Sequence, residues 1–411
     1  MPNFSLPDAV FERAAAQHPT PFYLYDERGI RQAARALRAA FAWNRGFRQF
    51  YAVKALPNPA ILRLMLEEGS GLDCSSLTEL LLAQKAGAAG RDIMFSANAM
   101  PHDELRLAHD LGACINLDDA SDVDSLLALG PVPGCLSLRV NPGERGSGHN
   151  GFMGGARDAK FGLLPEQLEP ALLTLKAGGA QRFGLHAMTA SNSLDAAYYP
   201  RNAAFLFETG LALEARTGLR LDFVNLSGGL GIPYREEEQA LDLARVGEAV
   251  RREYERAFGQ RADVRIFTEL GRLVTGPYGW LVTRAIHRKD TWRAFVGLDA
   301  SAANLLRPAM YGAWHHVSVS GKRAAPRDQV YDLTGPLCEN NDKFAIQRAL
   351  PEIALDDLVL IHDCGAHAHA MGYQYNGRLR SAELLHTLDG GIRMIRRAET
   401  PADYFATLVE G

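Results

Sequence analysis

Several β-rich runs of the chain end in a residue whose side chain could do chemistry. The run FRQFYAVKA (47–55) ends close to Lys54, and VRIFTELGR (264–272) ends in Glu269 and Arg272. Similar runs end in the remaining groups, which are Asp73, Arg139, His186 and the pair Gly228 and Gly229. In a closed parallel barrel the carboxyl ends of all strands lie on one rim, so these groups would meet there. Several reactive side chains on one rim indicate an active site more strongly than any one of them does alone.

Lys54 is the residue with the clearest chemical alternatives. Taken alone, it could be a strand-edge lysine that reaches solvent. A lysine desolvated beside apolar residues has a lowered pKa and can form a Schiff base with an aldehyde. Pyridoxal phosphate would supply that aldehyde, and it needs a phosphate cradle and a carboxylate that keeps its ring nitrogen protonated.

Two stretches would meet these needs. NLSGGLGIPY (225–234) has closely spaced glycines, which let backbone N–H groups approach an anion, although the same motif also makes plain structural turns. Glu269 would serve the ring nitrogen. In the same hypothesis the His186 ring stacks on the cofactor, but His186 could equally be a core histidine, and Arg139 could equally form an ion pair within the barrel.

The elements that must position these groups alternate between strand-like and helix-period runs. The eight strand-like runs are 47–55, 71–76, 92–97, 113–119, 135–141, 182–188, 222–229 and 264–272. Gly69, Gly87, Gly112 and Gly218 stand where helix C-caps are expected. Eight strands favour a (β/α)8 barrel over the competing doubly wound sheet.

After Arg272 the pattern changes to strand-like runs with short turns. We therefore predict a cofactor-binding (β/α)8 barrel over residues 27–276. Residues 1–26 and 277–411 are predicted to form an all-β domain, a sandwich or barrel, because TPFYLYD near the N-terminus is also strand-like.

Composition restricts the classes of partner. The 411 residues carry a formal net charge of −4, which argues against nucleic acid or an anionic membrane as the main partner. There is no 18-residue apolar run and no secretory signal pattern, so we expect a cytoplasmic protein. The five scattered cysteines are expected to be reduced thiols.

The motifs around the strand ends resemble those of one known family. They are YAVKA (51–55), GLDCSSLTEL (71–80), GLHA (184–187), LSGGLGIPY (226–234), TELGR (268–272), LLRPAMYGAWH (305–315), GPLCENND (335–342) and YNGRLRSAELL (375–385). Over nearly its whole length the chain is similar to the fold-type III pyridoxal phosphate enzymes of the alanine racemase and ornithine decarboxylase group. Within that group it most resembles the diaminopimelate decarboxylases. GPLCENND is the most specific motif, because Cys and Glu followed by Asp three residues after the Glu marks a decarboxylase.

The resemblance implies a role for each matching residue toward the cofactor. Lys54 would form the Schiff base, and Thr189 stands where the family usually has a phosphate-binding Ser. A carboxylate at Glu269 implies decarboxylation, since racemases of this fold type place an arginine at the ring nitrogen. The residues implied to bind the cofactor are Lys54, Asp73, Arg139, His186, Thr189, Gly228, Gly229, Gly231, Glu269, Gly271, Arg272 and Tyr375.

The resemblance also implies a substrate site shared between two subunits of a homodimer. Cys338, the expected proton donor, and Glu339 would reach in from the partner subunit. The implied catalytic residues are Lys54, His186, Cys338 and Glu339, and the implied substrate-binding residues are Arg272, Arg307, Tyr311, Glu339 and Tyr375. Arg307 suits a carboxylate and Glu339 an ammonium, so the expected reaction converts meso-2,6-diaminopimelate to L-lysine and CO2. Arg307 could instead form a domain-interface ion pair.

Two segments depart from the family pattern. The usual His-Ile-Gly-Ser is here His186-Ala187-Met188-Thr189, followed by Ala190-Ser191-Asn192, and the usual Glu-Pro-Gly-Arg is here 269–272, ELGR. The first departure lies beside the expected substrate. It keeps open a decarboxylase of another amino acid, such as D-lysine, D-ornithine or a siderophore intermediate.

Two further classes of protein share part of this pattern. A non-catalytic pyridoxal phosphate-binding barrel would lack the β domain and the Cys-Glu motif, and this chain has both. A metal-dependent barrel hydrolase would need a ligand set, and His362, His367 and His369 are the nearest candidates. Because they lack a Cys or carboxylate at ligand spacing, we predict no metal site.

Overall fold

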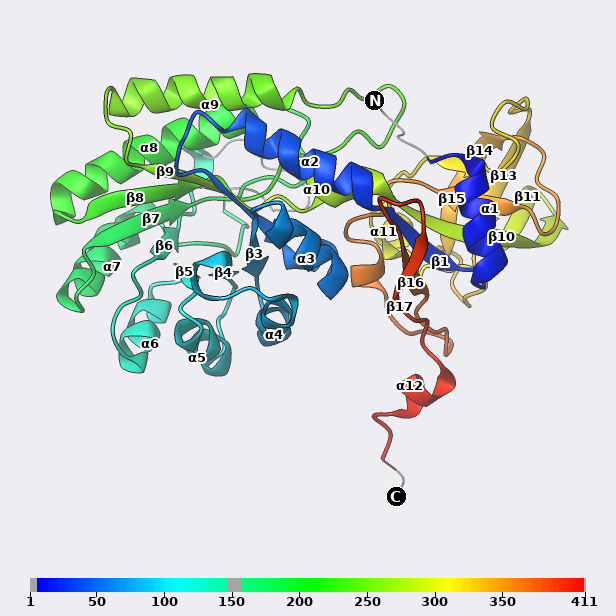
Figure 1. Ribbon diagram of the computed structural model, residues 1–411, viewed down its shortest axis with the longest axis horizontal. Coiled ribbons are helices and arrows are strands. Elements are labelled where there is room, and N and C mark those ends of the chain that lie inside the picture. Colours follow the sequence, from blue (N-terminus) through cyan, green and yellow to red (C-terminus); the bar gives the residue numbers. More distant parts are fainter. Residues whose placement is uncertain (1–5, 146–154, 156, 410–411) are drawn as a thin grey trace. The chain divides into compact units, whose positions relative to one another are not determined.

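The computed structural model describes residues 6–145, 155 and 157–409, which divide into two compact units (Figure 1). Residues 31–232 and 241–273 form the first, here called the barrel unit. The described residues up to Ile30, residues 233–240 and those from Val274 onward form the second, here called the β unit.

The barrel unit is a closed barrel of eight parallel strands, which confirms the predicted (β/α)8 fold over the doubly wound alternative. The strand order follows the sequence, and β2 pairs with β9 to close the barrel. The strands are β2 (Arg48–Ala52), β3 (Gly71–Cys74), β4 (Ile93–Ser96), β5 (Cys114–Leu117), β6 (Leu136–Arg139), β7 (Arg182–His186), β8 (Arg220–Asn225) and β9 (Arg265–Thr268). Most strand residues are buried because helices cover the barrel outside and side chains fill its inside.

The helices of the barrel start and stop where local chemistry allows. Ser76 caps α4 by accepting the Glu79 N–H, and Gly87 ends it in the left-handed conformation that costs glycine least. The helices and 3₁₀ turns are α2 (Glu27–Ala40), η1 (Val53–Ala55), α3 (Pro59–Glu67), α4 (Leu77–Ala86), η2 (Gly90–Asp92), α5 (His102–Asp110), α6 (Ser121–Leu129), η3 (Gly143–Arg145), α7 (Pro165–Ala177), α8 (Tyr198–Thr217), α9 (Leu243–Phe258) and α10 (Arg272–Thr275).

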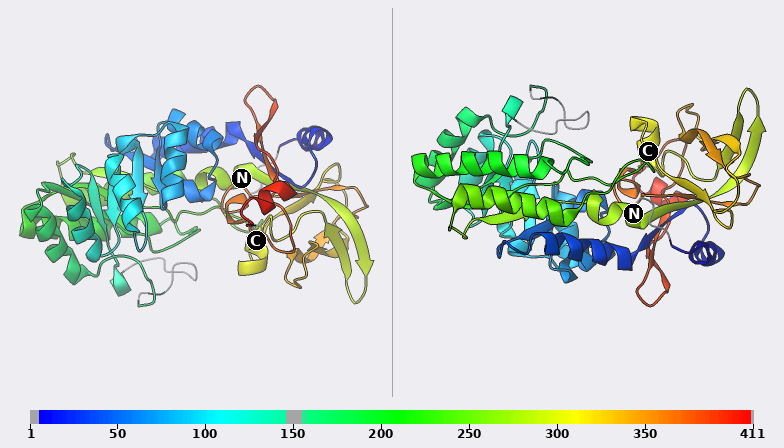
Figure 2. Two further views of the ribbon diagram at one scale, coloured as in Figure 1. Left: turned by 90° about the horizontal axis from the view of Figure 1, so that it is seen from below. Right: turned by 90° about the horizontal axis from the view of Figure 1, so that it is seen from above.

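The two longest helices of the barrel, α8 and α9, lie side by side on its outside (Figure 2). An aromatic cluster joins them, with the Phe207 ring 5.7 Å from that of Tyr254 and 5.1 Å from that of Phe258. This packing fixes α8, whose first turn carries Tyr198 and Tyr199 toward the barrel rim.

The expectation of five reduced thiols is wrong for one pair. Cys114 begins β5, Cys135 directly precedes β6, and the two form a disulfide with their Cα atoms 4.7 Å apart. Neighbouring parallel strands have this spacing, so the pairing follows from the fold and not from the 21-residue sequence separation. Cys74, Cys338 and Cys364 are free.

The β unit is built on one sheet of nine strands. Its main path runs β14-β13-β11-β10-β1-β16-β17, and β15 pairs with both β10 and β12. The strands are β1 (Phe22–Asp26), β10 (Gly279–Asp290), β11 (Ala294–Leu298), β12 (Val317–Val319), β13 (Gln329–Thr334), β14 (Lys343–Leu350), β15 (Leu358–Ile361), β16 (Ala382–His386) and β17 (Ile392–Arg396). The helices and 3₁₀ turns are α1 (Asp8–Gln17), η4 (Gly276–Tyr278), α11 (Leu306–Tyr311), η5 (His369–Met371) and α12 (Pro401–Phe405).

The N-terminal strand β1 lies in the middle of this sheet. It pairs antiparallel with β10 and parallel with β16, although more than 250 residues of chain separate it from either. Helix α1 packs Phe11 edge-on against Trp280 of β10, with ring centroids 5.3 Å apart. Both rings are fully buried, so the first described residues contribute directly to the core.

Among the described residues, no helix has the length and apolar character needed to cross a membrane.

Candidate active site

The lysine predicted to be reactive follows strand β2. Lys54 lies in the turn η1, and its Nζ is 3.2 Å from Oδ2 of Asp73 on the neighbouring strand β3. The Asp73 side chain is inaccessible to solvent, whereas 47% of the Lys54 side chain is exposed. The lysine therefore lies at the rim with one face open to a ligand.

The electrostatics of this pair differ from the sequence-based expectation. Burial lowers the pKa of Lys54, but the carboxylates of Asp73, Glu269 and Glu79 outweigh burial, so the pKa lies above its usual value. Burial and the nearby Glu269 raise the pKa of Asp73 to about 8. Both groups of the pair therefore hold their protons to a higher pH than usual.

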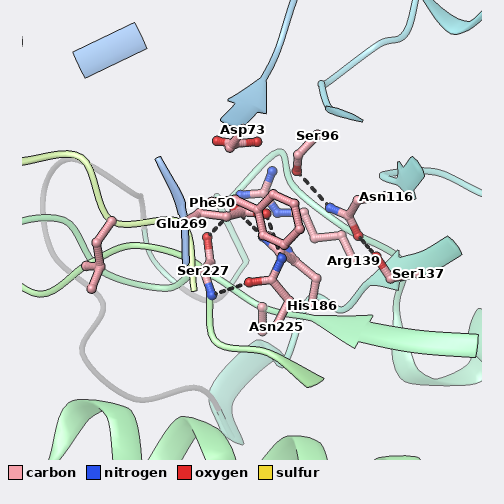
Figure 3. A network of polar contacts seen from close by, with 12 residues as sticks. Phe50, Asp73, Ser96, Asn116, Ser137, Arg139, His186, Asn225, Ser227 and Glu269 are labelled. Atoms are coloured by element: carbon pink, nitrogen blue, oxygen red, sulfur yellow. Dashed lines mark hydrogen bonds and ion pairs between the residues drawn. The ribbon is translucent and has the colours of Figure 1, made fainter. Parts of the chain in front are cut away.

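Glu269 is the centre of a buried polar network (Figure 3). Its Oε2 lies 3.0 Å from Nε2 of His186 and accepts a hydrogen bond of 2.9 Å from the Ser227 hydroxyl. Its Oε1 accepts a 2.7 Å hydrogen bond from Nδ2 of Asn225. Asn225 also accepts the Ser227 N–H through its Oδ1, at 2.8 Å. Strands β7, β8 and β9 thus bring their carboxyl ends together around one carboxylate.

This network keeps Glu269 ionised. Burial alone would raise its pKa, but His186, Lys54 and the Ser227 hydroxyl lower it to about 2. A carboxylate that stays charged in a buried site is the group needed to hold a proton on a ring nitrogen.

The glycine loop between β8 and α9 follows the same network. The N–H of Glu269 donates to the carbonyl of Ser227 at 2.7 Å, which fixes the loop beside the carboxylate. A Cβ at Gly229 would lie 2.5 Å from the Tyr198 ring, and one at Gly231 would lie 2.5 Å from Asn192 Oδ1. The loop therefore packs too closely for side chains at these two positions. A Cβ at Gly228 would also be tight, at 3.1 Å from the Glu269 carbonyl.

Other predicted cofactor residues adjoin this region. Thr189 is buried after β7 and donates its N–H to the Tyr198 hydroxyl at 3.3 Å. Gly271 follows Glu269, and a Cβ there would lie 2.6 Å from that of Ala55. Glycine at 271 thus lets the chain after β9 pack on the turn that carries Lys54.

Arg139 forms an ion pair within the barrel, which was one of the two roles that the sequence allowed. Its Nη1 lies 3.1 Å from Oδ1 of Asp118, which follows β5, and its guanidinium lies 4.3 Å from the centre of the Phe161 ring. The structure does not give it a hydrogen bond to Lys54 or Asp73 among the described residues. Arg139 is at the rim, as predicted, but Asp118 holds it.

Three polar residues of the rim were missed by the sequence analysis: Asn225, Ser227 and Asp118. Asn225 is the last residue of β8, and Asp118 directly follows β5. The rule that reactive groups sit at strand ends, applied to every run, would have found these two. Ser227 directly precedes Gly228 and Gly229, so the LSGGLGIPY motif already indicated that it lies in the site.

Arg272 begins α10 in the barrel unit, and the other predicted site residues not yet described belong to the β unit. Arg307 is buried in α11, whereas Tyr311, Cys338, Glu339 and Tyr375 are exposed. Two hydrogen bonds connect the three segments that carry them, from the Cys338 N–H to Asn376 Oδ1 at 2.8 Å and from Asn341 Nδ2 to the Ala309 carbonyl at 3.4 Å. Three motifs that are far apart in sequence are therefore neighbours in one unit.

The aspartate of the GPLCENND motif explains how that loop is held. Asp342 Oδ2 accepts the Leu337 N–H at 2.8 Å, and its Oδ1 accepts the Ala302 N–H at 2.6 Å. A Cβ at Gly335 would lie 2.4 Å from the same carboxylate. Asp342 and Gly335 therefore set the turn that presents Cys338 and Glu339.

The barrel rim fits the cofactor expected from sequence. Two buried polar atoms, Oδ1 of Asp73 and Nδ1 of His186, have no hydrogen-bond partner among the described residues, and buried polar atoms are normally paired. They lie with a half-exposed lysine, an ionised glutamate and a glycine loop. Pyridoxal phosphate, when bound, supplies an electron sink for the bond that breaks at Cα.

The histidines weighed as metal ligands have other partners. Nδ1 of His362 lies 3.2 Å from the Trp280 indole nitrogen, and its Nε2 lies 2.8 Å from the Ser318 hydroxyl. Nε2 of His369 lies 3.1 Å from the Ser381 carbonyl. Within the described part of the chain, no group of three His, Cys, Asp or Glu side chains is arranged to hold a metal ion.

Comparison with known proteins agrees with this site. Residues 27–276 match the family described as "Pyridoxal-dependent decarboxylase, pyridoxal binding domain". The chain is 45% identical over 387 residues to Protein TabA of Pseudomonas amygdali pv. tabaci, covering 94% of this chain and 90% of that protein. It is 34% identical over 392 residues to the diaminopimelate decarboxylase of Methanothermobacter thermautotrophicus, covering 95% and 91%.

Solved structures give the same result. Diaminopimelate decarboxylase from Helicobacter pylori, complexed with L-lysine, superposes with a TM-score of 0.87 at 29% identity and covers 96% of this chain and 98% of its own. The enzyme from M. jannaschii, also in complex with L-lysine, has a TM-score of 0.89 at 27% identity and covers 98% and 94%. The chain therefore belongs to the pyridoxal-dependent decarboxylases of fold type III, and it is a carboxy-lyase that uses pyridoxal 5′-phosphate.

Proposed function

We propose that this protein removes CO2 from meso-2,6-diaminopimelate and releases L-lysine. The observation that carries the proposal is the state of Arg307. This arginine is only 5% exposed, and its Nη1 donates to the Tyr234 hydroxyl at 2.9 Å and lies 3.2 Å from Nε2 of His315. Its guanidinium lies 4.8 Å from the centre of the Tyr234 ring.

A guanidinium fixed in this way is suited to bind a carboxylate. The planar fork of arginine pairs with both carboxylate oxygens, and fixing its orientation beforehand lowers the entropic cost of binding. His315 is itself fixed, since its Nδ1 lies 2.8 Å from the His362 carbonyl. In the proposal, Arg307 binds the distal carboxylate of the substrate and Glu339 binds the distal ammonium. A substrate such as ornithine has no distal carboxylate and would not need Arg307.

The barrel residues would then hold the reacting end. Lys54 would carry the cofactor until the substrate amine replaces it, and Glu269 would hold a proton on the ring nitrogen. Asp73, whose pKa is raised to about 8, would give a proton beside Lys54 and later take one back. His186 would orient the ring.

We further propose a homodimer in which Cys338 and Glu339 of each subunit complete the site of the other. The support is their exposure in the single chain, together with Tyr311 and Tyr375, each 43% exposed. Aromatic residues are enriched in the cores of protein interfaces. Cys338 would return the proton to Cα after CO2 leaves.

A second candidate substrate is another amino acid with a different distal end. It is favoured by the higher identity to Protein TabA, 45%, than to the Methanothermobacter diaminopimelate decarboxylase, 34%. The segment after His186 also departs from the usual family pattern. In this alternative the cofactor chemistry is the same and only the distal contacts change.

Measurement of CO2 release from a panel of substrates would test the proposal. The panel comprises meso-diaminopimelate, L- and D-lysine, L- and D-ornithine and arginine. We expect release from meso-diaminopimelate with the highest kcat/KM. A higher value for any monocarboxylate diamine would reject the proposed role of Arg307, and no release from any member would favour the second candidate.

A further inference from the structure

The glycine loop of the cofactor site is held by residues that the cofactor chemistry does not itself require. At its start, the Tyr199 hydroxyl donates to the Ser227 carbonyl at 2.6 Å. In its middle, the Ser193 N–H donates to the Gly229 carbonyl at 2.7 Å, and the Gly231 N–H donates to the Ser193 carbonyl at 2.9 Å. Ser193 thus makes a short parallel bridge to the loop.

Asn192 closes the far end of the loop. Its Oδ1 accepts the Ile232 N–H at 3.0 Å, and its Nδ2 donates to the Ile232 carbonyl at 3.4 Å. The amide therefore binds both backbone groups of one residue, as a neighbouring strand would. Together, Ser193 and Asn192 bind the backbone of Gly229, Gly231 and Ile232.

The backbone at Asn192 is suited to this contact. Its φ is +56°, in the left-handed region that asparagine tolerates better than most residues. The approach is also close, because a Cβ at Gly231 would lie 2.5 Å from Asn192 Oδ1 and 2.7 Å from its Cα. Asn192 thus combines a left-handed backbone with a side-chain amide that contacts the loop.

These contacts leave three successive backbone N–H groups of the glycine loop without an acceptor among the described residues. The N–H groups of Gly231 and Ile232 are engaged, by Ser193 and Asn192. Those of Gly228, Gly229 and Leu230 are buried and meet no acceptor in the described part of the chain. Successive N–H groups beside left-handed residues, here Ser227 at φ +57° and Gly229 at φ +104°, form a concave site for an anion.

We propose that Asn192 is a positioning residue for the phosphate of the cofactor. It acts through Ile232, by fixing the loop whose three buried N–H groups at 228–230 would bind the phosphate. It lies in the segment after His186, where this chain departs from the usual family pattern. Asn192 does not touch the reacting atoms.

Binding of two cofactor forms would test this role. The full chain, stripped of cofactor, is titrated with pyridoxal 5′-phosphate and with pyridoxal, which lacks the phosphate. Asn192→Gly keeps the left-handed backbone and removes the amide. We expect the dissociation constant for pyridoxal 5′-phosphate to rise about tenfold, and that for pyridoxal to change by less than about twofold.

The ratio of the two constants is the decisive quantity. A partly unfolded variant weakens both forms equally and leaves the ratio unchanged, so the test does not depend on full folding. Asp356→Gly is the matched control, because Asp356 also adopts a positive φ, +68°, but lies in the β unit. An unchanged ratio in Asn192→Gly would overturn the proposal, as would an equal change of the ratio in the control.

Discussion

The ammonium of Lys54 lies 3.2 Å from the carboxyl group of Asp73, and only the lysine is open to solvent. The pair joins the ends of two neighbouring strands, so the barrel itself sets the distance. Burial and the charge of Glu269 raise the pKa of Asp73, and the negative charges of Asp73, Glu269 and Glu79 raise the pKa of Lys54. The barrel thus places the amine and the carboxyl group of the proposed site within hydrogen-bonding distance of each other.

Replacement of Lys54 tests the covalent attachment of the cofactor. In Lys54→Ala, borohydride reduction of the loaded protein should leave no pyridoxyl group on the peptide that contains residue 54. Activity should fall by about three orders of magnitude or more, because in the proposed function this amine carries the cofactor. Mass spectrometry after proteolysis checks the adduct. The exposed Lys85→Ala is the control and should retain both adduct and activity, whereas an adduct that persists in Lys54→Ala would reject the assignment.

The shifted pKa of Asp73 predicts a pH dependence of stability. The folded chain holds the proton up to about pH 8, while the unfolded chain releases it near 3.8. Between these values the unfolded state binds fewer protons, so the folded state loses stability as pH rises, by up to about 1.4 kcal/mol per pH unit. Asp73→Asn removes this loss.

Urea unfolding of the cofactor-free protein between pH 5 and about pH 8 measures the effect. The stability of Asp73→Asn relative to wild type should increase with pH across this range. The exposed Asp290→Asn serves as control and should run parallel to wild type. Parallel curves for Asp73→Asn as well would mean that the carboxyl group titrates normally.

The hydroxyl of Tyr234 predicts a selective effect on substrate binding. Tyr234→Phe removes the 2.9 Å contact to Arg307 and keeps the ring beneath the guanidinium. If Arg307 binds the distal carboxylate, the KM for diaminopimelate should rise about fivefold to tenfold with kcat little changed.

Arg307→Ala should lower kcat/KM by about a hundredfold or more while the cofactor stays bound to Lys54. Tyr404→Phe, far along the chain in α12, is the control. Loss of cofactor absorbance in step with activity would place Arg307 at the cofactor instead.

The barrel and its rim were predictable because both follow from strand ends. Each of the eight β-rich runs overlaps one strand of the barrel. The residues at the ends of these runs include Lys54, Asp73, His186 and Glu269, which the structure places at the rim. Side-chain partners were less predictable, because they depend on three-dimensional neighbours. The Arg139 ion pair to Asp118 and the Cys114–Cys135 disulfide each join adjacent strands, and periodicity does not indicate which residues face each other.

The electrostatic prediction for Lys54 failed for a related reason. The sequence showed apolar neighbours, which lower the pKa of a lysine, but not the carboxylates that other strands bring to the rim. In the structure these outweigh burial, and the pKa is raised. Likewise, the contact between Asn192 and Ile232 spans 40 residues and no motif marks it.

The proposed dimer makes its own prediction, which activity measurements on mixed variants can test. Lys54→Ala lacks the cofactor lysine, and Cys338→Ala lacks the proposed proton donor. If each site takes its lysine from one subunit and its cysteine from the other, a heterodimer of the two variants contains one intact site and one site that lacks both groups. Each variant alone should be almost inactive. After subunit exchange of an equal mixture, half of the dimers are mixed, so activity should recover to about one quarter of wild type. Light scattering checks that the species is a dimer. A mixture no more active than its components, under conditions where labelled subunits do exchange, would show that Cys338 serves the site of its own subunit or none.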